Sequence, residues 1–63
     1  MSIEEVFSKI LDVDEKWETA KNYFSSKKIT KEYFVQLATS VAKQYISNLE
    51  YNKAIDVLEL LKK

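Results

Sequence analysis

The 63-residue sequence contains no cysteine, histidine, glycine or proline, and all ten of its basic residues are lysines. Without cysteine, neither a disulfide nor a thiolate metal site can form, and without histidine the usual neutral-pH base and commonest transition-metal ligand are missing. The lack of glycine also removes the loop that cradles phosphate groups. We therefore expect a protein that is not an enzyme and that holds no metal or cofactor.

The absence of arginine and the formal net charge of zero bear on possible partners. Arginine provides the commonest specific contact with guanine, and a neutral chain has no general attraction for phosphate. The charge is unevenly spread: residues 1–18 carry six acids and two lysines, net −4, whereas residues 19–53 carry six lysines and two acids, net +4. This polarity can orient an antiparallel neighbour or a second copy, although solvated helix faces that merely differ would give the same pattern.

The short length predicts one helical domain over residues 1–63 and points to a stabilising partner. A chain of this size buries only about 60% of the surface that its unfolded state exposes. The stretch "MSIEEVFSKILD" lacks a basic region and a long apolar core, so it does not predict a signal peptide, and no apolar run approaches the ~20 residues of a membrane span. We expect a cytoplasmic protein with no membrane association and no small-molecule substrate. The arginine-free, lysine- and asparagine-rich composition is typical of AT-rich genomes and suggests a viral or plasmid gene.

Helix is the expected structure throughout, because the residues that most often interrupt helices are absent. Ser2 and Glu5 form a capping box, and Thr30 can cap a helix that has Glu32 in its first turn. The segment "SSKKIT" at 25–30 is the one clear polar break. Apolar residues recur at helical spacing in three stretches: Ile3, Val6, Phe7, Ile10, Val13, Trp17, Ala20 and Phe24; Phe34, Leu37, Ala38, Val41, Tyr45 and Leu49; and Ala54, Ile55, Leu58 and Leu61, with Val57 and Leu60 on an adjacent face.

Two all-α architectures fit this pattern. In the first, two long helices, roughly 3–25 and 31–62, form a hairpin that dimerises into a four-helix bundle. In the second, further breaks near 12–15 and 47–50 divide the chain into a small bundle of helical hairpins, with Asp12 or Asp14 capping a new helix. Asn48 would then be placed to close the preceding helix.

An internal similarity at an offset of 34 residues favours the second architecture. Large, small and aromatic residues pair in a consistent order: Phe7 with Val41, Ser8 with Ala42, Leu11 with Tyr45, Trp17 with Tyr51, Ala20 with Ala54, and Phe24 with Leu58. This period and order resemble the tetratricopeptide repeat, and "YNKAI" at 51–55 is similar to the opening of that family's second helix. The resemblance implies two helical hairpins and a protein-binding role. Glu4, Lys27, Ala38 and Leu61 depart from the family pattern, and its glycine and proline punctuation is missing.

A second resemblance covers about a third of the chain. The segments "DEKW" and "KKITKEYF" are similar to the helix–turn–helix dimerisation hook of the SinI/SinR-type antirepressors, although the proline of that family is absent. This resemblance also implies self-association.

We interpret the sequence as a small protein–protein interaction or adaptor module, working as a homodimer or on another protein. The expected interface is apolar surface left uncovered by the chain's own fold: Val57, Leu60 and Leu61, with Tyr23 and Tyr33 at the rim. The alternative is a regulator of transcription or replication that contacts nucleic acid through Lys27, Lys28 and Lys31. The acidic stretch "DVDEKWE" lacks the glycine of a calcium loop, and we interpret it as a helix cap followed by first-turn acids.

Overall fold

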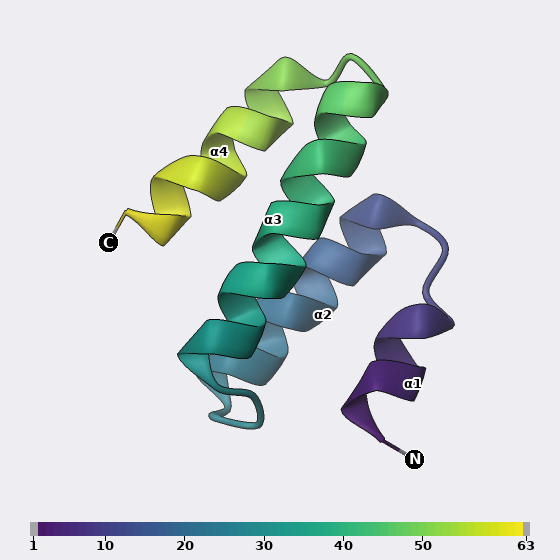
Figure 1. Cartoon of the computed structure of the whole chain (residues 1–63), viewed down its shortest axis with the longest axis vertical. Coiled ribbons are helices and arrows are strands. Elements are labelled where there is room, and N and C mark those ends of the chain that lie inside the picture. Colours follow the sequence, from purple (N-terminus) through teal and green to yellow (C-terminus); the bar gives the residue numbers. More distant parts are fainter. Residues whose placement is uncertain (1, 63) are drawn as a thin grey trace.

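The protein is all-α, as the sequence predicts. The computed structural model describes residues 2–62, within which there are four helices and no strand: α1 (Ile3–Ser8), α2 (Val13–Ser25), α3 (Lys31–Ser47) and α4 (Tyr51–Leu61) (Figure 1). No helix in this range has the length and apolar character needed to cross a membrane.

The first three helices begin where local sequence provides a side-chain cap. The Ser2 hydroxyl accepts a hydrogen bond from the Glu5 amide, and the Thr30 hydroxyl accepts one from the Tyr33 amide. A carboxylate oxygen of Asp12 accepts the amide of Asp14. Each cap satisfies a backbone N–H that the first turn of a helix leaves without a partner. The residue before α4, Glu50, makes no such bond.

Two helices end in left-handed turns without glycine. After α2, Lys27 has a φ of 61°, and after α3, Leu49 has a φ of 64°. In the first turn the Lys28 amide donates to the Tyr23 carbonyl and the Lys27 amide to the Phe24 carbonyl; the amides of Glu50 and Leu49 repeat the pattern. These are Schellman motifs, which satisfy the last carbonyls of a helix. For a residue with a Cβ, the left-handed conformation costs about 1–2 kcal/mol, so tertiary packing must hold both turns in place.

The architecture with two long helices is wrong, because the chain leaves the helix at residues 9–12 and again at 48–50. The first interruption follows from the Asp12 cap, which starts a new helix instead of continuing the old one. Ile10, which belongs to the apolar stripe from Ile3 to Phe24, lies in this connection, so the stripe is not one continuous helical face. At the second interruption Asn48 is the cap residue, as predicted, but Leu49 takes the left-handed conformation.

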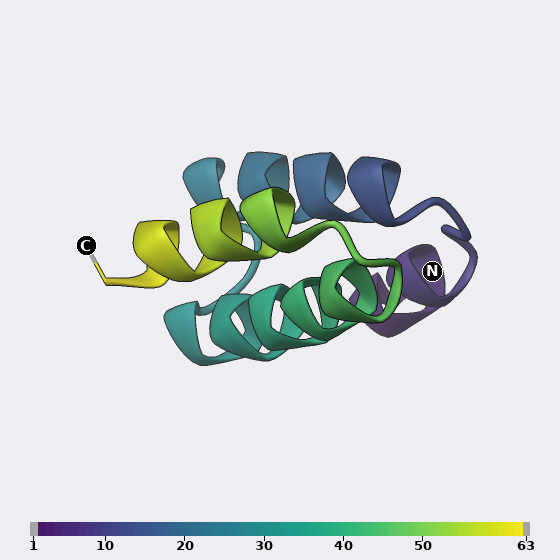
Figure 2. The ribbon, with the colours of Figure 1, turned by 90° about the horizontal axis from the view of Figure 1, so that it is seen from above.

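The helices form a thin plate. Helices α2 and α3 run antiparallel, α4 folds back along α3, and α1 lies on the opposite side from α4 (Figures 1 and 2). The close helix pairs are α3 with α4 and α2 with α3. The Cα atoms extend 32 × 27 × 14 Å, so the plate is little thicker than two packed helices.

The core is assembled mainly by α3, which supplies half of its buried residues. The Phe34 ring stacks on Trp17 with centroids 5.5 Å apart and on Phe24 with centroids 4.3 Å apart, which joins α3 to two turns of α2. Alanines are buried on α2, α3 and α4, where a small side chain allows neighbouring helices to approach closely. The buried apolar residues are Phe7, Trp17, Ala20, Ile29, Phe34, Leu37, Ala38, Val41, Ala42, Tyr45, Ala54 and Val57.

Candidate interaction surface

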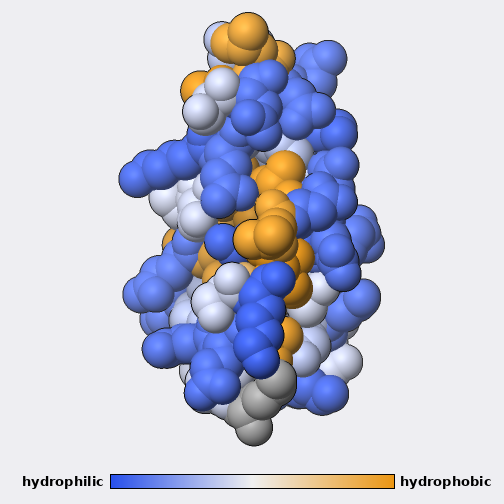
Figure 3. Space-filling model, turned by 90° about the vertical axis from the view of Figure 1, so that its right-hand side faces the viewer, coloured by the Kyte–Doolittle hydropathy of each residue, from blue (hydrophilic) through white to orange (hydrophobic). Residues whose placement is uncertain are grey.

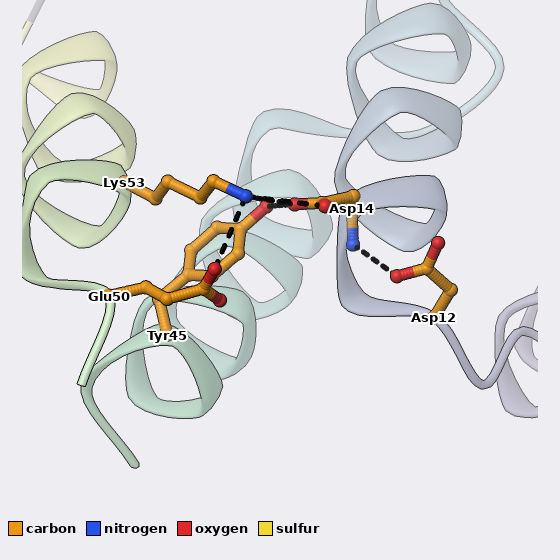
Figure 4. Close-up of polar contacts among 5 residues, drawn as sticks. All are labelled: Asp12, Asp14, Tyr45, Glu50 and Lys53. Carbon is orange, nitrogen blue, oxygen red and sulfur yellow. Dashed lines mark hydrogen bonds and ion pairs between the residues drawn. The ribbon is translucent and has the colours of Figure 1, made fainter. Parts of the chain in front are cut away.

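The most connected polar cluster ties three helices together. Asp14 at the start of α2 accepts a hydrogen bond of 2.5 Å from the Tyr45 hydroxyl of α3, and its carboxylate lies 3.3 Å from the Lys53 ammonium of α4 (Figure 4). The same ammonium lies 3.3 Å from the Glu50 carboxylate and 5.6 Å from the centroid of the Tyr45 ring. One charge-assisted network therefore fixes the relative positions of α2, α3 and α4.

The electrostatics of this cluster favour a structural role. The hydrogen bond from Tyr45 lowers the pKa of Asp14, and Lys53 adds to this effect. Burial, with the adjacent Asp14 carboxylate, raises the pKa of Tyr45, and the hydrogen bonds to Asp14 and Glu50 raise the pKa of Lys53. All three pKa values move away from neutrality, whereas an acid or base in catalysis needs a pKa near the working pH. In the described part of the chain, no group of three or more acidic side chains is arranged to hold a metal ion.

The pKa shifts in this cluster predict that the free energy of unfolding is nearly constant around neutral pH and falls at acidic and at alkaline pH. The lowered pKa of Asp14 gives stability above its ordinary value of 3.8 that is lost as pH falls through the folded-state pKa. The raised pKa of Tyr45 gives stability below its ordinary value of 10.0 that is lost as pH rises through the folded-state pKa. We expect Tyr45→Phe to flatten both limbs of a urea-unfolding profile measured from about pH 3 to about pH 11.

The control for this prediction is Tyr51→Phe, which removes a hydroxyl from a ring that is 54% exposed. Its profile should match that of the wild-type protein. A Tyr45→Phe profile that also superimposes on wild type would contradict a stabilising role for the Asp14–Tyr45 bond.

Large apolar side chains remain exposed around the plate, because a body so thin cannot enclose the outer faces of its helices. They are Leu11, Phe24, Val35, Ile46, Leu49, Tyr51, Ile55, Leu58 and Leu60. Single exposed apolar residues are ordinary on protein surfaces, whereas several on one helix face mark a contact surface.

Helix α4 carries such a group, which we call the α4 stripe: Tyr51, Ile55 and Leu58. Their exposed fractions are 54%, 50% and 45%. The spacing i, i+4, i+7 places all three on one side of the helix. The stripe lies beside, and not within, the face that α4 turns toward the core, where Ala54 and Val57 are buried. Helix α4 therefore has two neighbouring apolar faces and uses only one of them inside the chain.

The prediction that Val57 is uncovered is wrong, because the side chain is 1% exposed. Ala54 and Val57 pack inward, and the small Ala54 allows a close helix approach. Ile55 and Leu58 face outward, although in the sequence they share one stripe with Ala54 and Leu61. Helical periodicity gives no signal that separates the two faces, because both have the same spacing.

The other predicted interface residues lie in three separate places. Leu61 is half-buried against the core, and Leu60, 39% exposed, lines a groove with Lys21, Phe24, Ser25 and Phe34. Tyr23 and Tyr33 are half-buried on the far side of the plate, where both rings contact Phe7 of α1. The structure does not bring these four residues together into one surface.

The lysines of the nucleic-acid alternative lie on the α2–α3 connection and on the first residue of α3, and all three are exposed. The Lys28 ammonium lies 5.4 Å from the centroid of the Tyr23 ring. Contact of Lys27, Lys28 and Lys31 with nucleic acid stays a prediction of the sequence.

Comparison with known protein families, curated proteins and solved structures finds no match to this chain. The resemblances to the tetratricopeptide repeat and to the dimerisation hook stay predictions. Of the residues that carry the repeat pattern, seven are buried in the core and five are exposed. The buried ones are Phe7, Trp17, Ala20, Val41, Ala42, Tyr45 and Ala54, and the exposed ones are Ser8, Leu11, Phe24, Tyr51 and Leu58.

Proposed function

We propose that the protein is a small non-catalytic interaction module that forms a homodimer through the α4 stripe. The observation that carries this proposal is the half-exposure of Tyr51, Ile55 and Leu58 on one side of α4. A helix with one side against a core normally presents charged or polar residues on the rest of its surface. Here a second apolar side is exposed. Covering it adds stability that matters to a chain of 63 residues, because so small a core stabilises the fold only weakly.

A second copy of the chain is the occupant that the stripe fits best. A two-fold interface brings the same surface together from both copies, so it must be complementary to itself. If two α4 helices pack antiparallel, Ile55 of one copy opposes Leu58 of the other, and Tyr51 opposes Lys62. This arrangement pairs apolar with apolar residues and places an ammonium group over an aromatic ring. It also sets the two helix dipoles in opposite directions.

The size of the stripe predicts a weak dimer. An α-helix of 11 residues is about 16 Å long, so its face alone buries well under the ~800 Å² per partner of a standard interface. The exposed Ile46 and Leu49, which precede α4, can extend the contact. We expect a dissociation constant of about 10–100 μM, which corresponds to about 5–7 kcal/mol of binding free energy.

Replacing Ile55 with lysine should convert the dimer to a monomer without loss of helix. Lysine has at least the helix propensity of isoleucine, and the side chain at this position is half exposed, so folding should be preserved. Sedimentation equilibrium from about 10 μM to about 1 mM should show the wild-type mass rising toward twice that of one chain. The variant should keep the mass of a single chain over the same range.

The matched control is Leu11→Lys, which makes the same kind of change at an apolar residue outside α4 that is 94% exposed. This variant should dimerise as the wild-type protein does. A wild-type chain that stays monomeric at the highest concentration, or a dimer that Ile55→Lys leaves intact, would refute the proposal.

A further inference from the structure

Helix α1 is attached to the rest of the protein in a different way from the other helices. Within residues 2–62, every hydrogen bond of the segment 2–10 joins two members of that segment, and no ion pair links it to α2, α3 or α4. In contrast, α2, α3 and α4 share the Asp14–Tyr45–Lys53 network. Only apolar packing and diffuse charge interactions hold α1 in place.

One side chain provides most of this packing. Phe7 is 4% exposed, and its ring meets Tyr23 edge-on with centroids 5.5 Å apart and Tyr33 edge-on with centroids 6.3 Å apart. Ile3 and Ile10, one helical turn to either side, are partly buried against the core. This is the pattern by which a short amphipathic helix binds a groove on another protein, with a central aromatic anchor and aliphatic residues on either side of it.

The groove that receives Phe7 lies between the end of α2, the connection 26–30 and the first turn of α3. Part of it stays open, lined by Ser2, Ile3 and Glu4 on one wall and by Lys28, Ile29, Thr30 and Tyr33 on the other. The charges of the two walls are opposite, because α1 carries Glu4 and Glu5 in its first turn. The facing wall contributes Lys28, with Lys27 beside it in the connection and Lys31 at the start of α3. In the described residues no lysine of the loop forms an ion pair with these carboxylates, so the attraction acts at longer range and is sensitive to salt.

Helix α1 depends on this groove for its structure. A helix of six residues is far below the ~12–15 residues at which an isolated helix becomes marginally stable. In the link between α1 and α2, Leu11 is 94% exposed and adds no packing against the other helices. Apolar atoms form a strip down the face of the molecule on which α1 and its link lie, with hydrophilic groups on both sides (Figure 3). The segment 2–11 shares no described hydrogen bond or ion pair with α2, α3 or α4, so its release from the groove would break only apolar packing.

We propose that this groove is a docking site for a short acidic amphipathic helix that presents a phenylalanine from another protein, and that α1 is the ligand that occupies it in the resting chain. The walls fit such a partner because they already bind one: the rings of Tyr23 and Tyr33 receive the phenylalanine, and Lys28 in the wall attracts the carboxylates. This site lies on the opposite side of the plate from α4 and is independent of the proposed dimer (Figure 1).

Tethering makes α1 a competitor of any such partner. A short flexible link gives a bound segment an effective concentration in the millimolar range. An external helix of similar affinity must displace α1. Its apparent affinity is its intrinsic affinity multiplied by the fraction of chains in which α1 has left the groove. Weakening α1 should therefore strengthen binding of the external helix by at least tenfold.

The test uses the full chain with Phe7→Ser, which removes the anchor of α1, and a labelled synthetic peptide with the sequence of residues 2–12 as the probe. Fluorescence anisotropy should show the peptide binding to the Phe7→Ser chain at least tenfold more tightly than to the wild-type chain. A peptide with Phe7→Ala should not bind, and a peptide with Glu4→Lys and Glu5→Lys should bind more weakly. Raising the salt concentration should weaken binding of the unaltered peptide, and Tyr33→Ala in the Phe7→Ser chain should abolish it.

Three outcomes would overturn the proposal. The first is no binding to the Phe7→Ser chain while Trp17 fluorescence and circular dichroism show that the other helices are folded. The second is global unfolding of that chain, because the proposal requires α1 to leave an intact bundle. The third is a dimer that persists with Ile55→Lys and is lost with Phe7→Ser, since this would assign the groove to α1 of a second copy. Peptide binding should be unchanged by Ile55→Lys, so failure of the proposed dimer leaves this test intact.

Discussion

Replacing Phe34 with alanine is expected to leave much of the protein unfolded at room temperature. The ring is 4% exposed and stacks on Trp17 and Phe24, so it joins α3 to two turns of α2. Removing a buried phenylalanine costs about 3–5 kcal/mol, through lost transfer free energy and the cavity that remains. A domain of 63 residues has a total unfolding free energy of about 3–9 kcal/mol, so the loss is comparable with the whole.

Thermal unfolding followed by circular dichroism and by the fluorescence of Trp17 would measure this effect. Val35→Ala is the matched control, because it truncates the next residue of α3, which is 38% exposed. The control should cost well under half as much, since Val35 loses only two methyl groups at a position that stays partly in water. Equal losses in the two variants would mean that the stacked rings do not hold α2 against α3.

Replacing Ala54 with leucine is expected to destabilise the protein by about 1–3 kcal/mol, although leucine is larger, apolar and a good helix former. Ala54 is 3% exposed on the side of α4 that packs inward. A larger side chain must push α4 away from its neighbours or adopt a strained rotamer. Either response also disturbs the adjacent Lys53, whose ammonium pairs with Asp14 and Glu50.

Asn52→Leu is the control for this overpacking effect, because it adds the same side chain to α4 at an exposed position. Its unfolding free energy should stay within about 0.5 kcal/mol of the wild-type value. If chemical denaturation shows Ala54→Leu to be as stable as this control, then α4 does not approach its neighbours as closely as the burial of Ala54 indicates.

Sequence patterns predict the local structure well, because caps and helical periodicity act over a few residues. Ser2, Asp12 and Thr30 all cap helices as expected, and their hydrogen bonds reach only two or three residues along the chain. The left-handed turn after α3 was harder to locate, since Asn48 is a better local candidate than Leu49. The polar network was not predicted, because its members are 31 and 39 residues apart in the sequence.

The sequence alone determined that this chain is helical, that Ser2 and Thr30 start helices, and that it has more apolar helix surface than a small domain hides. Only the tertiary structure decided which part of that surface remains exposed. Helix α4 has two adjacent apolar faces, and periodicity cannot choose between them, because both have the same spacing. The choice depends on where a small residue permits close approach, and Ala54 turns Val57 inward and leaves Tyr51, Ile55 and Leu58 outside.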